Sequence, residues 1–133
     1  MLRTLNTTIF SYVLRRPPPE AIDRLAAFQR DQLWISAIVA SELRFGARNL
    51  VALGFAAAVA SWLCGFILKH WPVEASHHYA SMRAVLERAG TPVGNMDLLI
   101  AAHASAEDSV VITNNAREFH RIPGIAVEEW TFR

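Results

Sequence analysis

Four polar residues that are far apart in the sequence occupy equivalent places: Asn6, Glu42, Asp97 and Asn115. Each follows a short apolar segment or lies in the first turns of the helix expected after one. In a parallel α/β sheet such positions meet at the carboxyl edge of the strands, where these folds bind ligands. All four side chains carry oxygen, the ligand atom that Mg²⁺ and Mn²⁺ prefer. The pattern therefore predicts a divalent-cation site that could orient a water for attack on phosphorus. Only two of the four residues carry charge, which is fewer than such a site normally has.

The two carboxylates also have a simpler, structural interpretation. Asp97 falls in the first turn of its predicted helix, and Glu42 falls in the second turn of its own. The positive end of the helix dipole stabilises carboxylates near a helix start without any ligand. Spacing alone therefore leaves both a structural and a catalytic role open for each residue.

Short apolar strands alternate with helical segments along the chain. The pattern predicts strands at residues 1–5, 33–35, 110–112 and 125–130, and helices at 9–14, 20–30, 37–48, 75–89 and 96–106, with Ser36 and Asn95 as helix caps. This alternation indicates an α/β fold whose parallel sheet is covered by helices on both faces. Because the chain has 133 residues and shows no repeat or linker, we expect a single domain spanning residues 1–133.

The segment 50–68 contains no charged residue, and its length is close to that of a membrane-spanning helix. Two glycines, a serine and five alanines dilute its hydrophobicity, and Arg48 and Lys69 flank its ends with the same charge. The flanking charges give no orientation bias across a membrane. We therefore expect a buried helix or a dimer-interface helix, with a membrane span as the alternative.

The overall composition narrows the class of protein only slightly. The formal net charge is +1, which gives no general attraction to nucleic acid or membrane. A single cysteine, Cys64, cannot form an internal disulfide, and no signal peptide is evident at the N-terminus. These features favour a reducing, cytoplasmic location.

Five segments together resemble the PIN-domain toxins of the VapC family: Ile35–Gly46, Gly90–Ala104, Thr113–Phe119, Ile122–Gly124 and Val127–Trp130. The order and spacing of these motifs fit the family over nearly the whole chain. The resemblance implies a three-layer α/β/α fold with a short central parallel sheet, and a homodimer. It also implies a Mg²⁺- or Mn²⁺-dependent endoribonuclease that cleaves RNA and is held inactive by a VapB-type antitoxin.

The resemblance also assigns roles to individual residues. In the family the first acidic ligand lies in a Leu-Asp-Thr-Asn pattern, which matches Asn6 and its neighbours, and the second and third match Glu42 and Asp97. The fourth family position, aspartate or asparagine, matches Asn115. The supporting residues expected around the site are Thr7, Thr113 and Asn114.

Asn6 is the main departure from the family pattern, since it replaces an aspartate. An amide oxygen can still contact a cation, but a full negative charge is missing, so the resemblance implies weaker metal binding and little or no cleavage. Either an engineered exchange or a naturally decayed site would explain the asparagine. The alternative function is a catalytically silent module that dimerises and binds an antitoxin.

In the family, the antitoxin usually lays a helix and an extended tail along an apolar groove of the toxin. We expect the groove here to involve residues near the N-terminus, namely Phe10, Tyr12, Val13, Leu14, Leu25 and Phe28. The remaining aromatic and imidazole side chains have structural interpretations. Histidines without Cys or His partners at zinc spacing are expected on helix faces, and tryptophans are expected as core or interface anchors: His77, His78, His103, Trp34, Trp62, Trp71 and Trp130.

Overall fold

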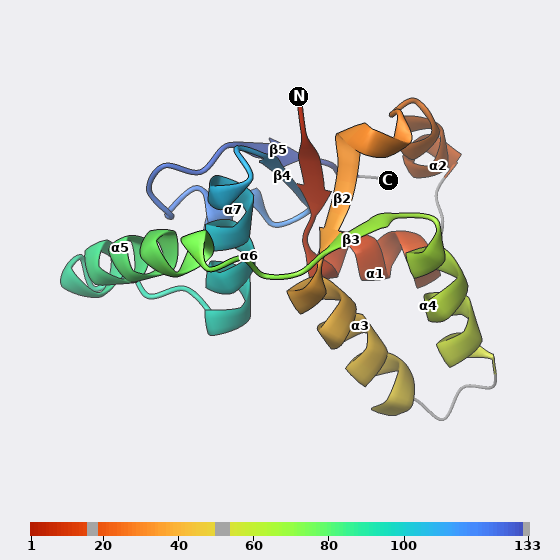
Figure 1. The fold of residues 1–133 in the computed structure, drawn as a ribbon, viewed down its shortest axis with the longest axis horizontal. Coiled ribbons are helices and arrows are strands. Elements are labelled where there is room, and N and C mark those ends of the chain that lie inside the picture. Colours follow the sequence, from red (N-terminus) through yellow and green to blue (C-terminus); the bar gives the residue numbers. More distant parts are fainter. Residues whose placement is uncertain (16–18, 50–53, 132–133) are drawn as a thin grey trace.

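The computed structural model describes residues 1–15, 19–49 and 54–131. Its centre is a five-stranded sheet in the order β3-β2-β1-β4-β5, and every neighbouring pair is parallel. Figure 1 shows the sheet between two groups of helices. The strands are β1 Arg3–Leu5, β2 Leu33–Ser36, β3 Ile67–Lys69, β4 Val110–Thr113 and β5 Val127–Glu129. The predicted parallel α/β fold is therefore confirmed.

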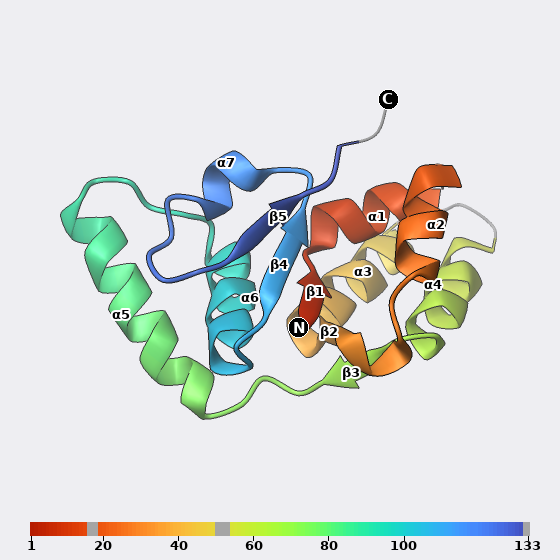
Figure 2. The same ribbon diagram turned by 90° about the horizontal axis from the view of Figure 1, so that it is seen from above.

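The helices form the two outer layers of this fold. Figure 2 shows α5 and α6 on one side of the sheet, and α1, α2 and α4 on the other. Their bounds are α1 Thr7–Arg15, α2 Pro19–Ala26, α3 Ala37–Asn49, α4 Phe55–Cys64, α5 Glu74–Arg88, α6 Asn95–Ala106 and α7 Ala116–Phe119, with a 3₁₀ helix at Arg30–Gln32. The arrangement is the three-layer α/β/α fold expected from the sequence.

Alternation along the strands divides the core between the two faces of the sheet. Leu5, Ile35 and Ile112 are buried in a cluster with apolar residues of α1, α3 and α4. Val111, which neighbours Ile112, is buried in a second cluster with residues of α5, α6 and α7. Successive side chains of a strand point to opposite faces, so one short strand such as β4 contributes to both clusters.

The expectation of one apolar helix over residues 50–68 is wrong. Residues 50–53 lie outside the described ranges, α4 ends at Cys64, and Ile67 and Leu68 belong to strand β3. These two residues pair with Trp34 and Ile35 of β2, so the free energy of strand pairing outweighs continuation of the helix. No helix within the described ranges is long and apolar enough to cross a membrane.

Two of the predicted helix caps have different outcomes. Ser36 caps α3 as expected, since its hydroxyl oxygen accepts a hydrogen bond from the Ile38 amide at 3.1 Å. Asn95 is not a cap, because it is already the first residue of α6 and Gly94 precedes the helix without a side-chain bond.

The predicted helix over 20–30 is shorter than expected, since α2 ends at Ala26.

His103 joins the elements on either side of the site. It was expected on a helix face, and it is fully buried between α6 and the sheet. Its ring packs against Trp34 of β2 in a tilted arrangement, with centroids 4.4 Å apart and ring planes at 55°. Its Nδ1 lies 2.8 Å from the hydroxyl oxygen of Ser36. Because Ser36 also caps α3, this contact fixes the start of α3 against α6.

Candidate functional site

The first part of the site lies where β1 enters α1. Asn6 is almost completely buried there, with 1% of its surface exposed. Its Oδ1 accepts a hydrogen bond from the Ile9 amide at 3.2 Å and so caps α1. Its Nδ2 donates to Thr8 Oγ1 at 3.0 Å, and the Thr8 hydroxyl donates to Asn114 Oδ1 at 2.8 Å. Asn6 therefore links the end of β1 to the end of β4.

Glu42 approaches the same place from the second turn of α3. The Thr7 hydroxyl donates a hydrogen bond of 2.6 Å to Glu42 Oε1. This short bond to a carboxylate is of the strong, charge-assisted kind. Thr7, which follows Asn6 in the chain, therefore orients the Glu42 carboxylate.

Asp97 lies in the first turn of α6 and is partly buried. Burial raises its pKa to about 7, with further contributions from the negative charge of Glu118, a hydrogen bond with Glu118 and the negative charge of Glu42. Both neighbours therefore lie close enough to act on Asp97. Carboxylates from α3, α6 and α7 thus share one electrostatic environment at the carboxyl edge of the sheet.

Glu118 is the site residue that the sequence interpretation missed. Its two carboxylate oxygens accept hydrogen bonds from the Gly94 amide and from Asn115 Nδ2, each at 3.3 Å. Glu118 thereby connects α7 to the start of α6, next to Asp97. The sequence contained a usable signal, because Glu118 lies three residues after Asn115, a spacing that brings side chains together on one helix face.

The turn after β4 is held by its own polar residues. Thr113 is fully buried, and its hydroxyl oxygen accepts a hydrogen bond from the Asn115 amide at 2.9 Å. Asn114 is exposed and receives the Thr8 hydroxyl. The structure therefore brings all four predicted core residues of the site, and their three predicted supporting residues, to one edge of the sheet.

The donor set suits a hard divalent cation, but the charge is low. The side chains supply only oxygen ligands. Burial raises the pKa of Asp97 most, and the negative charges of Glu118 and Glu42, which a cation would offset, raise it further. Within the described ranges, however, no three Asp, Glu, His or Cys residues come together closely enough to hold a metal ion. Asn6 occupies the place where an aspartate would add a carboxylate. The residues therefore fit a weakly held cation whose remaining ligands are waters and a substrate phosphate.

The predicted antitoxin groove is only partly at the surface. Phe10 and Val13 are 1% exposed and belong to the core, because α1 turns them toward the sheet and α4. Leu14, Leu25 and Phe28 are half-buried, and Tyr12 is exposed. Leu25 lines two adjoining cavities of about 430 and 220 Å³ beside α2 and α4, and Phe28 lines the smaller of them.

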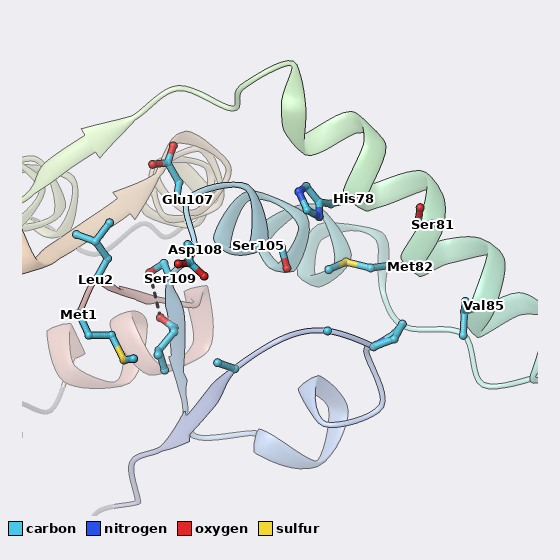
Figure 3. A pocket seen from close by; sticks show the side chains of 14 residues that line it. Met1, Leu2, His78, Ser81, Met82, Val85, Ser105, Glu107, Asp108 and Ser109 are labelled. Atoms are coloured by element: carbon cyan, nitrogen blue, oxygen red, sulfur yellow. Dashed lines mark hydrogen bonds between the residues drawn. The ribbon is translucent and has the colours of Figure 1, made fainter.

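A cavity larger than these two lies away from the predicted site. Its volume is about 800 Å³. Figure 3 shows it between α5 and the amino-terminal ends of β1 and β4, with Met1, Leu2, Met82 and Asp108 among its lining residues. None of the predicted site residues lines it. Cavity size and site chemistry therefore indicate different places, and the grouped carboxylates with the raised pKa of Asp97 favour the carboxyl edge.

Comparisons with known proteins agree with this geometry. The family model of the PIN domain matches residues 4–125. The chain belongs to the PIN-domain family. Two VapC proteins resemble it over nearly the full length of both chains. The tRNA(fMet)-specific endonuclease VapC of Salmonella typhimurium is 38% identical, covering 94% of this chain and 93% of the relative. Ribonuclease VapC2 of Rickettsia felis is 31% identical, covering 98% of each chain.

Solved structures of VapC proteins share the same fold. A chain of the DNA-bound VapBC crystal structure from Salmonella typhimurium superposes with a TM-score of 0.93 at 35% identity, covering 98% of this chain and 100% of that one. A chain of VapBC2 from Rickettsia felis, bound to a DNA fragment from its promoter, also gives a TM-score of 0.93, at 30% identity. The resemblance to VapC-type PIN domains that the motifs indicated is therefore confirmed.

Proposed function

We propose that this VapC-type PIN domain is the toxin of a toxin–antitoxin pair, a Mg²⁺- or Mn²⁺-dependent endoribonuclease that Asn6 weakens or silences. The observation that carries the proposal is that Glu42, Asp97 and Glu118 lie at the same edge of the sheet as Asn6, where burial and the charges of Glu118 and Glu42 raise the pKa of Asp97 to about 7. The names of the VapC relatives, which are ribonucleases and an endonuclease, support the same reaction class.

Each side chain has a specific task in this proposal. Glu42 and Asp97 hold the cation together with the Asn6 amide oxygen, and Asn115 lies at the edge of the site. A bound divalent cation supplies charge stabilisation at phosphate and lowers the pKa of a coordinated water. Thr7 keeps the Glu42 carboxylate in place through its 2.6 Å hydrogen bond. Asp97 must lose its proton to act as a ligand, so metal binding strengthens as the pH rises through about 7.

Asn6 changes the charge of the site without changing its shape. Asparagine and aspartate are nearly the same size, and the Asn6 Oδ1 contact with the Ile9 amide is one that an aspartate oxygen can also make. The missing negative charge reduces the attraction of the site for the cation, because contacts made by a charged group are stronger than those made by a neutral one. We therefore expect normal folding with weak metal affinity.

The test is the Asn6→Asp variant, assayed for RNA cleavage with Mg²⁺ or Mn²⁺ and with a chelator. We expect the variant to cleave at least ~100-fold faster than the chain itself, because one removed site ligand or donor commonly costs that much in rate. Asn49→Asp is the matched control, since it adds the same charge at an exposed position at the far end of α3, outside the site. Asn6→Asp combined with Asp97→Asn must abolish the gain. A variant that stays inert on every RNA tried contradicts the nuclease proposal.

A second candidate function is a catalytically silent module that binds an antitoxin. The observation in its favour is the use of the Asn6 amide as a donor to Thr8, whose hydroxyl continues to Asn114. An ionised aspartate cannot donate that first bond. Calorimetry separates the two functions, because the silent module binds antitoxin tightly and shows no metal affinity with either residue at position 6.

Partners form part of the same proposal. The solved neighbours are VapBC assemblies, which supports a VapB-type antitoxin as the partner of this chain. The substrate would be RNA in single-stranded or looped form, since the A-form duplex presents little base-edge information to side chains. A homodimer, a single domain over residues 1–133 and a cytoplasmic location complete the proposal.

A further inference from the structure

One aromatic side chain beside the site is conspicuously open to solvent. Of the Phe, Tyr and Trp side chains that the structure describes, Phe45 is the most exposed, at 69%. It lies on α3, three residues after Glu42. Residues three apart on a helix are neighbours on its surface. The ring therefore lies one helical turn from a carboxylate of the site.

The ring also borders a cavity that shares two lining residues, Thr7 and Glu42, with the site. The cavity has a volume of about 240 Å³ and is lined by Thr7, Ser11, Glu42, Leu43, Phe45, Gly46 and Phe55. Thr7 and Glu42, which are joined by their 2.6 Å hydrogen bond, form the wall shared with the acidic site. Aromatic surface, hydroxyl groups and a carboxylate therefore meet in one small space. A Cβ added at Gly46 would meet no atom within 4 Å, so the helix surface beside the ring is open.

We propose that Phe45 is a stacking platform for a nucleobase of the RNA whose phosphate is held at the acidic site. This inference rests on the proposed nuclease function and names how its substrate is held. A base presents an apolar planar face and a polar edge, which match the Phe45 ring and the hydroxyl groups of Thr7 and Ser11. Stacking of a base on an aromatic side chain contributes on the order of 1–3 kcal/mol and accepts any base. Helix α3 would thus supply both a carboxylate for the reaction and a ring for the substrate.

The chemistry of the cavity favours a base over an apolar side chain of a protein partner. An apolar side chain would cover the Glu42 carboxylate without offering it a donor, and burying a charge in that way is costly. The amino groups and ring NH groups of a base can donate to this carboxylate and to the hydroxyl oxygens. Because Thr7 and Glu42 line this cavity and also belong to the acidic site, a base in the cavity would lie close to the phosphate held there.

The test measures RNA binding by the full chain, whose expected weak cleavage allows equilibrium titration. The probe is a short single-stranded RNA with the fluorescent base 2-aminopurine placed at successive positions, because stacking quenches its fluorescence. We expect one position to be quenched on binding. Phe45→Leu should remove this quenching and weaken binding ~5- to 150-fold, the equivalent of the stacking contribution. Phe45→Trp should restore both, and Val73→Ala, at a similarly exposed apolar position, should change neither.

Several results would overturn the inference. The first is unchanged quenching and affinity in Phe45→Leu. The second is loss of RNA affinity in Phe45→Leu that accompanies a change of oligomeric mass in sedimentation, which assigns Phe45 to an interface between two copies. The third is weakened antitoxin binding with unaltered RNA binding. Absence of RNA binding by any form of the chain also overturns it.

The enzyme assay separates this inference from the nuclease proposal. In the Asn6→Asp background, Phe45→Leu should raise KM and leave kcat nearly unchanged, because the ring binds the substrate away from the reacting atoms. Cleavage by Asn6→Asp with no effect of Phe45→Leu on KM contradicts the stacking role alone. If Asn6→Asp is inert but Phe45→Leu still removes the quenching, only the nuclease proposal is contradicted.

Discussion

Polar groups are buried in two regions of the fold, the cluster around His103 and the acidic site at the carboxyl edge of the sheet. The pKa values of the buried groups shift in opposite directions in these two regions. In the buried cluster, Trp34 Nε1 donates to Ser109 Oγ at 3.0 Å, and Ser36 Oγ lies 2.8 Å from His103 Nδ1. Burial lowers the pKa of His103 to about 4, so its ring is neutral at physiological pH. In the acidic site, burial and two neighbouring carboxylates raise the pKa of Asp97 to about 7.

Burial disfavours the charged form in both places, and for that reason it moves the two pKa values in opposite directions. The His103 cluster avoids a buried charge by keeping the ring neutral, with Nδ1 in hydrogen-bond contact with Ser36. Its Nε2 lies 3.7 Å from Glu107 Oε1, which is too long for a hydrogen bond. Because the lowered pKa keeps the His103 ring neutral, this contact is not an ion pair. The acidic site retains like charges close together, an arrangement typical of sites that bind a counter-ion.

The largest expected effect on stability comes from breaking the buried cluster with His103→Ala. The change leaves a cavity against Trp34 and removes the partner of a buried hydroxyl, so we expect a loss of about 2–4 kcal/mol in the free energy of unfolding. Urea unfolding at neutral pH measures it. His77→Ala, at an exposed position on α5, is the control and should change stability by less than ~0.5 kcal/mol.

The same variant changes the response to acid. The ordinary pKa of histidine, 6.5, is lowered to about 4 in the fold, so below 6.5 the unfolded chain binds a proton that the folded chain does not. Stability therefore falls as the pH drops from about 6.5 toward 4. His103→Ala should flatten that part of the stability curve. An unchanged slope would mean that His103 is more accessible than the structure shows.

The acidic site should show the opposite sign with Asp97→Asn. Because the pKa of Asp97 is raised from 3.8 to about 7, the folded chain binds the extra proton between these values, and stability decreases as the pH rises through them. Replacing the carboxylate should therefore stabilise the metal-free protein at about pH 8 by ~1–2 kcal/mol, a figure reduced for solvent screening. At about pH 4 the variant should match the parent chain.

Magnesium provides the control for the Asp97→Asn experiment. Saturating Mg²⁺ at about pH 8 should stabilise the parent chain, because the cation offsets the repulsion between Asp97 and the neighbouring carboxylates. It should leave the variant unaffected, because the substitution has already removed that repulsion. A variant that is less stable than the parent at every pH would show that Asp97 is a structural cap and does not belong to a strained acidic group.

A smaller effect is expected where opposite charges meet at the surface. Arg3 Nε and Glu128 Oε2 form an ion pair of 2.8 Å between β1 and β5, with side chains 27% and 38% exposed. Burial acts to raise the pKa of Glu128, but hydrogen bonds from Trp130 and Arg3 outweigh it and lower the pKa overall. Arg3→Ala should cost about 0.2–1 kcal/mol. This loss should vanish in acid, as Glu128 takes up its proton, and thermal unfolding at two pH values checks it.

The sequence predicted the main architecture because its signals were local. Alternating apolar strands and helices indicated the parallel α/β fold, and the motifs around Glu42 and Asp97 placed both carboxylates at the correct edge. Ser36 was recognisable as a helix cap from its position alone. The predictions that were wrong concerned features that depend on contacts between residues distant in sequence. Strand β3 was hidden inside an apolar segment, since only pairing with β2 distinguishes Ile67 and Leu68 from the preceding helix.

Side-chain environments were harder to predict than elements. The apolar periodicity of α1 does not reveal that Phe10 contacts Trp62 and Phe66 of the α4 region, with ring centroids at 6.1 and 5.2 Å, and is therefore unavailable to a groove. Glu118 was overlooked because Asn115 filled the expected fourth position. The burial of His103 follows from the Trp34 ring on a different element, which no local pattern indicates.

The central claim is that Asn6, which precedes α1, Glu42 of α3 and Asp97 of α6 bind one cation together, and that asparagine at position 6 weakens this binding. Titration with Mn²⁺, followed by electron paramagnetic resonance of the free ion, tests this claim most directly. We expect one weak site in the chain itself, tightening at least ~10-fold in Asn6→Asp and disappearing when Asp97→Asn is added. Equal Mn²⁺ affinity in all three forms, or no site in Asn6→Asp, would contradict it.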